Sequence, residues 1–321
     1  MAAAPPVLQG PYTGINELYS RHKIMLSSKV KKYCLYAPSI MKQTVLLFLT
    51  ISLLTNTTFG QDNASKQTAR QTPFVLGIVD NIHSVELGEN RILNIYLPEK
   101  YSKDSATTYP VIYLLDGSAN EDFIHVVGVV QFLVMIEAIP KSIVVGIANV
   151  DRKRDLTFPT TIEQDKKDYP TTGSSAKFMA FIEKELQPFV ETKYKTNNAK
   201  TIIGQSLGGL FATEVLLKKP RLFDNYIIVS PSLWWDNETV LATAPKLLEK
   251  EDDHNIHVYI SIGNEGKIME DDAKHLAEIL QTSRKKNWHT DFVRLPNENH
   301  LTILHNAVYK AMQALYPKKV E

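Results

Sequence analysis

Short apolar runs alternate along the chain with longer segments in which apolar residues recur every three or four positions. Continuous apolar runs of this length suit strands that are covered on both faces of a sheet. One run instead alternates polar and apolar residues, which predicts a half-buried strand. The predicted strands are 91–97 (the alternating one), 111–115, 142–147, 201–204, 226–229, 257–262 and 291–295.

Helical periodicity follows or separates most of these strands. The predicted helices are 176–194, 207–219, 272–284 and 301–315. Pro220 ends the second of them, because proline disfavours the helical conformation of the residue before it. The last has a single apolar face, made of Leu301, Leu304, Val308, Ala311, Met312 and Leu315. Repeated strand–helix units predict the α/β class, with a mainly parallel central sheet and helices on both faces.

The first seventy residues do not share this pattern. Met41 and Lys42 precede an apolar core of roughly ten residues, and Gly60 follows a polar stretch. This predicts a signal peptide at 41–60, since a spanning helix needs about 20 apolar residues. We interpret 1–40 as a non-native or mis-called extension and the polar segment 61–72 as a linker. One domain, of the α/β class, is expected at 73–317.

Composition and charge exclude several function classes. The formal net charge is +1, so no strong global field is available to hold nucleic acid or a membrane surface. Cys34 is the one cysteine, which excludes an internal disulfide framework and a multi-cysteine metal site. We expect no metal, no cofactor and no nucleic-acid partner. After signal cleavage we expect no stable membrane span and a periplasmic or secreted location.

The string Gly204-Gln205-Ser206-Leu207-Gly208-Gly209 carries the most chemical information. It fits G-x-S-x-G between a buried strand and a helix, a turn that strains the serine backbone and exposes its hydroxyl. A side chain at Gly204 or Gly208 is expected to strike the adjacent strand or helix. The following helix points its N-terminus at the site and favours developing negative charge. Ser206 is therefore the predicted nucleophile.

A serine hydroxyl needs a base, and the base in such a fold follows the last strand. His300 stands there, just before the final helix, and is the predicted general base. An acid that orients the imidazole should follow the preceding strand, in the chain order Ser, acid, His. Glu265 is the first acid beyond 257–262 and is preferred. Asp271, or a Ser–His dyad without an acid, remains an alternative.

The tetrahedral oxyanion requires two backbone donors. The first is the amide of Leu207, the residue after the nucleophile. The second is expected in the loop after 111–115, where Asp116-Gly117-Ser118 can turn back toward the serine. Either Gly117 or Ser118 is the predicted second donor.

These residues resemble the putative-esterase family of α/β hydrolases, in the branch of the siderophore (enterobactin-type and bacillibactin-type) esterases. The resemblance covers roughly 75–316. Its matching strings are YPVIYLLDG from Tyr109, VGIAN with RDLT, GQSLGGLFA from Gly204, SPSLWWD from Ser230, and Asn299-His300. The tryptophan-containing string is the most specific of them.

The resemblance implies the α/β-hydrolase fold, ester hydrolysis and catalytic roles for Ser206 and His300. It also places Trp234 and Trp235 near the pocket, where they stack on substrate or pack as lid or core. Arg154 meets an anionic substrate or pairs with a carboxylate such as Asp155. The sequence thus predicts a serine esterase that cleaves small-molecule esters through an acyl-enzyme. An acyltransferase or a non-catalytic binding protein on the same fold is the alternative.

Overall fold

An eight-stranded sheet forms the centre of the computed structural model, which describes residues 71–249, 254–283 and 285–317. The strand order is β1-β2-β4-β3-β5-β6-β7-β8. β1 pairs antiparallel with β2 and β2 antiparallel with β4, and every later pair is parallel. The strands are β1 (Ile78–Ser84), β2 (Glu89–Tyr96), β3 (Tyr109–Leu114), β4 (Ile143–Ile147), β5 (Thr196–Gln205), β6 (Asn225–Val229), β7 (Ile256–Ile262) and β8 (Trp288–Arg294).

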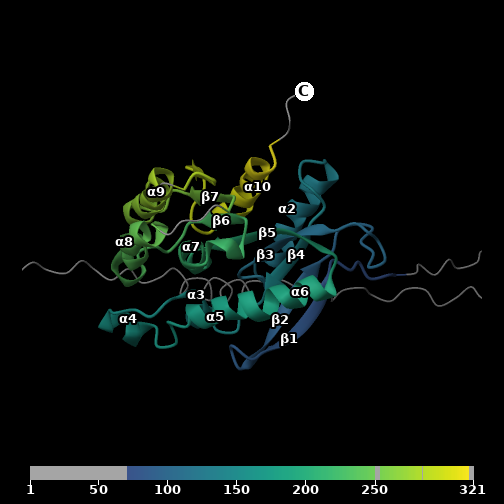
Figure 1. The fold of residues 1–321 in the computed structure, drawn as a ribbon, viewed down its shortest axis with the longest axis horizontal. Coiled ribbons are helices and arrows are strands. Elements are labelled where there is room, and N and C mark those ends of the chain that lie inside the picture. The colour runs from purple at the N-terminus through teal and green to yellow at the C-terminus, as the bar shows by residue number, and fades with distance from the viewer. Residues whose placement is uncertain (1–70, 250–253, 284, 318–321) are drawn as a thin grey trace, which may run out of the picture. The chain divides into compact units, whose positions relative to one another are not determined.

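Helices cover both faces of the sheet (Figure 1). They are α2 (Phe123–Met135), α3 (Arg152–Leu156), α4 (Glu163–Asp168), α5 (Ser175–Phe181), η2 (Ile182–Leu186), α6 (Gln187–Lys193), α7 (Leu207–Lys218), η3 (Pro220–Leu222), α8 (Trp235–Leu248), α9 (Lys267–Thr282) and α10 (Ile303–Leu315). α2 and α10 pack in one apolar cluster, and α5 to α9 contribute to the other. The α/β class predicted from the alternating pattern, with a mainly parallel sheet and helices on both faces, is therefore confirmed.

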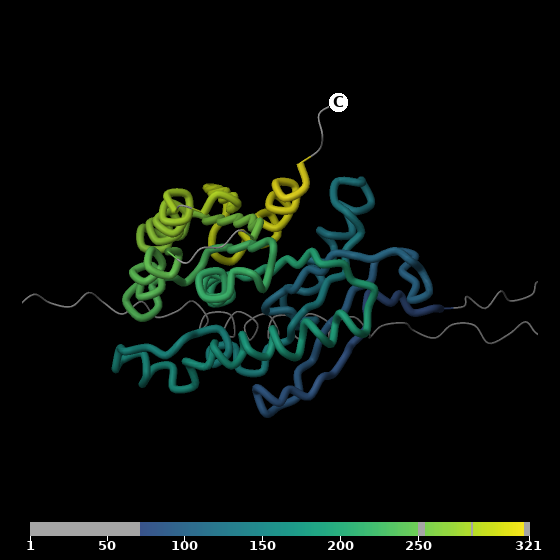
Figure 2. The backbone as a smooth tube through the Cα atoms, in the orientation of Figure 1, coloured from purple at the N-terminus to yellow at the C-terminus, as the bar shows by residue number. Residues whose placement is uncertain are grey.

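Side-chain alternation explains how one strand serves both layers. In β3, Tyr113 belongs to the cluster with α7, whereas Ile112 and Leu114 belong to the cluster with α2 and α10. Every residue of β3 is buried, as expected for a strand between two helical layers. Figure 2 shows the β1–β2 hairpin at one edge of this unit and the later, yellow-green elements toward the other.

The structure corrects two expectations about burial. Strand β2 is not half-buried in strict alternation, since Arg91 and Asn94 are buried and Ile92 is exposed. Arg91 is buried because it forms an ion pair with Asp155 at 2.6 Å. Leu301 does not join the apolar face of the last helix: it precedes α10 and is 69% exposed.

The predicted extension 1–40, signal peptide 41–60 and nearly all of the linker 61–72 lie outside the described residues, as does Cys34. The described residues belong to one compact unit, Gln71–Glu321. Within that part of the chain, no helix combines the length and the apolar character that crossing a membrane requires.

Candidate active site

Ser206 stands at the turn between β5 and α7 in a backbone conformation that non-glycine residues rarely adopt. Its φ is 60° and its ψ is −119°. Such strain persists only where surrounding structure fixes it, and it concentrates at functional sites. Here the Ser206 N–H donates to Val229 O at 3.1 Å, and Ser206 O accepts from the Ser232 N–H at 3.0 Å. The last residue of β6 and the loop that follows it therefore hold both backbone polar groups of Ser206.

The glycines of this turn are not equally constrained. A Cβ at Gly204 would lie 2.3 Å from Gly208 O, as the sequence predicts. A Cβ at Gly208 would meet its nearest atom at 3.4 Å, an ordinary contact, so the expected clash at Gly208 is wrong. The second crowded position is Gly209, where a Cβ would lie 2.9 Å from Pro231 Cα. Helix α7 thus packs closely against the loop that follows β6.

His300 and Glu265 meet at the same edge of the sheet, from the loops after β8 and β7. His300 Nδ1 lies 2.6 Å from Glu265 Oε2. The Glu265 side chain is 2% exposed, whereas that of His300 is 39% exposed. A buried carboxylate therefore contacts an imidazole whose other face remains open to solvent. That is the arrangement expected of an acid that orients a catalytic histidine.

Glu265 is stabilised as a carboxylate by its neighbours. Burial by itself raises the pKa of this carboxyl, but hydrogen bonds from His300, Ser230 and the Gly263 amide outweigh it and lower the pKa below its usual value. Ser230 Oγ donates to Glu265 Oε1 at 2.5 Å, and the Gly263 N–H donates to the same oxygen at 3.1 Å. Glu265 is thus ionised at neutral pH and fixed in orientation.

The alternative acid, Asp271, lies elsewhere. It is 58% exposed and forms an ion pair with Lys267 on the surface of α9. Glu270 forms an ion pair with Arg294 and accepts a hydrogen bond from the Glu265 N–H at 3.2 Å. Of the acids that follow β7, Glu265 is therefore the one that the structure brings to His300.

The Ser206 hydroxyl contacts the hydroxyl of Ser232. Ser206 Oγ lies 3.3 Å from Ser232 Oγ, and among the described residues this is its one side-chain hydrogen bond. No hydrogen bond joins Ser206 to the His300 ring within the described part of the chain. The two loops are nevertheless tied, because Gln205 Nε2 donates to the backbone carbonyl of His300. Catalytic hydrogen bonds are often long in substrate-free enzymes and tighten when substrate binds.

The predicted oxyanion donors differ in availability. Leu207 is the first residue of α7. Its amide is therefore one of those at the helix N-terminus, beside Ser206, that have no partner within the helix. The Gly117 N–H donates to Ile147 O at 3.0 Å, and Gly117 O accepts from Asn94 Nδ2 at 2.7 Å. The Gly117 amide is therefore already used in a hydrogen bond to Ile147 O, so Ser118 is the better candidate for the second oxyanion donor.

An arginine that the sequence reasoning missed fixes the loop carrying these donors. Arg152 makes two hydrogen bonds to Asp116, at 2.6 and 2.9 Å, and a third to Gln205 O at 3.4 Å. Asp116 is buried, has a φ of 53° and also accepts from Asn149 Nδ2 at 2.7 Å. The only sequence signal was the position of Arg152 just after a buried strand and its loop. It links the loop after β3 to the residue before the nucleophile.

The structure separates the two tryptophans. Trp235 is 2% exposed, and its indole N–H donates to Phe158 O at 2.9 Å. Trp234 is 39% exposed and lies two residues beyond Ser232, which contacts Ser206. Trp235 therefore packs in the core, whereas Trp234 remains partly exposed to solvent.

Arg154 is occupied by structural ion pairs. It binds Glu89 at 2.6 Å and Asp155 at 2.8 Å, and Asp155 in turn pairs with the buried Arg91. This network fastens α3 to β2. Of the two roles that the sequence suggests for Arg154, the structure shows the pairing with Asp155. Its guanidinium is occupied by Glu89 and Asp155 and is not free for an anionic substrate.

The chain is similar to several known proteins. The family model described as "Putative esterase" matches residues 84–305. The ferri-bacillibactin esterase BesA of Bacillus subtilis is 30% identical over 256 residues, which cover 71% of this chain and 86% of BesA. A solved IroE-like serine hydrolase from Shewanella oneidensis is 31% identical, with a TM-score of 0.69 over 75% of this chain and 80% of that chain. The BES protein from Bacillus cereus is 27% identical, with a TM-score of 0.67 over 78% of this chain and 98% of that chain.

Proposed function

Because the chain belongs to the esterase family of α/β hydrolases and is a carboxylic ester hydrolase of the serine type, we propose that Ser206 is its nucleophile, His300 its general base and Glu265 the orienting acid. The observation that carries this assignment is the buried Glu265 carboxylate, 2.6 Å from His300 Nδ1, at the sheet edge where Ser206 is strained. The names of the relatives do not favour an acyltransferase or a non-catalytic binding protein.

The mechanism begins when Ser206 Oγ leaves Ser232 and attacks the ester carbonyl. His300 Nε2 takes the hydroxyl proton while its Nδ1–H donates to Glu265, whose charge stabilises the imidazolium. The amides of Leu207 and Ser118 receive the oxyanion. His300 then gives its proton to the leaving alcohol and later activates a water that releases the acid. Each proton thus passes through one imidazole.

For the substrate we propose a siderophore-type ester. BesA is named for the esterase activity on ferri-bacillibactin, and BesA shares 30% identity with this chain over most of its length. The exposed Trp234, two residues beyond the Ser232 that contacts Ser206, offers a flat apolar surface on which an aromatic acyl group can stack. The proposed substrates are therefore molecules that carry both an aromatic acyl group and an ester or lactone bond.

A substrate panel tests this proposal. The full chain is assayed with bacillibactin, enterobactin, a phenyl acetate and a long-chain aryl ester, and kcat/KM is compared. We expect hydrolysis of all short esters and the highest kcat/KM for the catecholate lactones, with Trp234→Ala lowering kcat/KM for these by about tenfold through a raised KM. Equal kcat/KM across the panel would remove the siderophore assignment and leave the esterase assignment intact.

We also propose export to the periplasm or the medium, on the basis of the apolar segment 41–60. The N-terminus of the mature protein, read by sequencing material from cell fractions, tests this. Cleavage close to Gly60 supports export, whereas an intact N-terminus in the cytosolic fraction contradicts it.

A further inference from the structure

Three metal-ligating side chains gather on one face of the last two strands, two at the amino ends and one at the middle of β8. His257 and His289 are each the second residue of their strand, β7 and β8, and they are direct cross-strand partners. Asp291 lies two residues beyond His289, so its side chain points to the same face of the sheet. The pairing of two strands therefore fixes all three positions.

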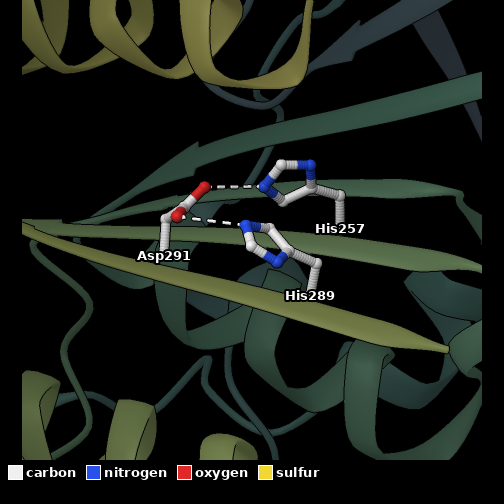
Figure 3. Close-up of side chains that lie close together, drawn as sticks. All are labelled: His257, His289 and Asp291. Carbon is white, nitrogen blue, oxygen red and sulfur yellow. Dashed lines mark hydrogen bonds and ion pairs between the residues drawn. The ribbon is translucent and has the colours of Figure 1, made fainter. Parts of the chain in front are cut away.

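The three side chains converge on one point (Figure 3). His257 Nε2 lies 2.7 Å from Asp291 Oδ2, and His289 Nε2 lies 3.2 Å from Asp291 Oδ1. One ligand atom from each residue lies within 4.8 Å of the other two. The rings stand nearly perpendicular, at 87°, with centroids 4.4 Å apart, so both imidazoles direct a nitrogen to the same carboxylate without stacking.

The cluster is held firmly on one side and open on the other. The side chains of His257 and Asp291 are 20% and 31% exposed, whereas that of His289 is 66% exposed. The His257 N–H donates to Asp224 O at 2.9 Å, which fixes the backbone at the start of β7. An ion can therefore enter from solvent past His289 and meet ligands on rigid elements.

We infer that His257, His289 and Asp291 form a binding site for Zn²⁺. Two imidazoles and a carboxylate are a ligand set that zinc uses, at about 2.0–2.2 Å from each ligand atom, with solvent completing the tetrahedron. Ligand atoms within 4.8 Å of one another must come closer around a single ion, and the exposed side chain of His289 has room to rotate toward the other two. Nitrogen donors favour Zn²⁺ over Ca²⁺ and Mg²⁺, which prefer oxygen ligands.

The site is separate from the proposed active site. Glu265 and His300 follow the carboxyl ends of β7 and β8, whereas His257 and His289 lie at the amino ends of these strands and Asp291 at the middle of β8. A seven-residue strand is about 20 Å long at roughly 3.3 Å per residue. The ion therefore takes no part in ester hydrolysis. Its effect is to fasten β8, an edge strand with no fully buried residue, to β7.

Zinc titration of the natural full chain, without an added histidine tag, tests the site by calorimetry. We expect one Zn²⁺ per chain for the wild type and for Ser206→Ala, which separates zinc binding from hydrolysis. His289→Ala and Asp291→Asn should weaken binding by at least about tenfold, since even outer partners of metal ligands account for about 10–100-fold in affinity.

His83→Ala is the matched control, because His83 lies on the opposite edge strand, β1, and hydrogen-bonds to Asn90. It should bind like the wild type. Zn²⁺ should also raise the Tm of the wild type and of His83→Ala but not of His289→Ala. Equal zinc affinity in the wild type and His289→Ala, or no measurable binding by the wild type, would overturn the site. Because His289 is largely exposed, its replacement leaves the fold intact, which circular dichroism verifies.

Discussion

Glu265 Oε2 lies 2.6 Å from His300 Nδ1, and the same carboxylate is held by Ser230 and the Gly263 amide through its other oxygen. The acid is therefore fixed before any substrate arrives. This contact fixes the orientation of the His300 ring. Because Nδ1 faces Glu265, Nε2 is the nitrogen left for the nucleophile and the leaving group.

Replacing Glu265 tests whether the protein uses a triad or a Ser–His dyad. Glu265→Gln removes the charge that stabilises the imidazolium, and we expect kcat to fall by about 10²- to 10⁴-fold with little change in KM. Asp271→Asn is the matched control: its carboxylate is exposed and paired with Lys267, so activity should be unchanged. If Glu265→Gln retains wild-type kcat on a short aryl ester, the dyad is the correct description.

Much of this site could be predicted from the sequence. The strand, the small residues and the helix around Ser206 form a local pattern, and the order Ser, acid, His follows from the parallel sheet. The sequence favours Glu265 because it is the first acid after β7, but it leaves Asp271, six residues further along the chain, as an alternative. The structure decides between the two acids, because Ser230, the residue after β6, holds the Glu265 carboxylate beside His300.

Two features that the sequence did not reveal depend on contacts between distant segments, and a third has a local cause. Arg152 acquires its role only when α3 meets the loop after β3. Trp235 is buried and its indole N–H donates to the Phe158 carbonyl, whereas Trp234 is partly exposed. The helix α2 was not predicted although Phe123, Val126, Val127 and Val130 are buried at helical spacing, because β-branched residues favour strands in a local reading.

The Arg152–Asp116 pair should matter more to catalysis than the Arg154 network does. Arg152→Ala leaves the buried Asp116 carboxylate without its bidentate partner in the loop that carries Ser118. We expect kcat to fall by at least about tenfold and the free energy of unfolding to fall by about 1–3 kcal/mol. Kinetics and urea unfolding measure the two effects.

Arg154→Ala is the comparison variant for this prediction. It should lower the free energy of unfolding by a similar amount through Glu89 and Asp155, while KM for anionic and neutral esters stays unchanged. A selective rise in KM for anionic esters would instead place Arg154 in the substrate site.

Stability should depend on pH through Asp272. Burial first, and then the negative charge of Glu238, raise the pKa of this carboxyl to about 6. A carboxyl whose pKa is higher in the folded state stabilises the protein below its unfolded pKa, and that contribution is lost as pH rises through about 6.

Asp272→Asn keeps the shape without the charge. We expect it to raise the free energy of unfolding by about 1–2 kcal/mol at pH 8 and to give no gain at pH 4. Urea unfolding of the wild type and the variant at both pH values measures this, with the exposed Asp271→Asn as control. An equal effect at pH 4 and pH 8 would show that the charge of Asp272 is not the cause.

Two glycines of the nucleophile turn offer a matched test of packing. Gly204→Ala places a Cβ 2.3 Å from Gly208 O, so the turn must open. We expect a loss of more than about 3 kcal/mol in the free energy of unfolding, together with loss of activity. Gly208→Ala meets only ordinary contacts and should stay within about 1 kcal/mol of the wild type. Thermal unfolding of the pair decides, and similar losses in both would contradict the packing described for this turn.

Covalent labelling by a fluorophosphonate, with the modified peptide identified by mass spectrometry, tests the central claim most directly. The wild type should carry one adduct on Ser206, Ser232→Ala should still be labelled, and Ser206→Ala should neither be labelled nor hydrolyse a short aryl ester. An adduct on another residue, or substantial hydrolysis by Ser206→Ala, would contradict the account.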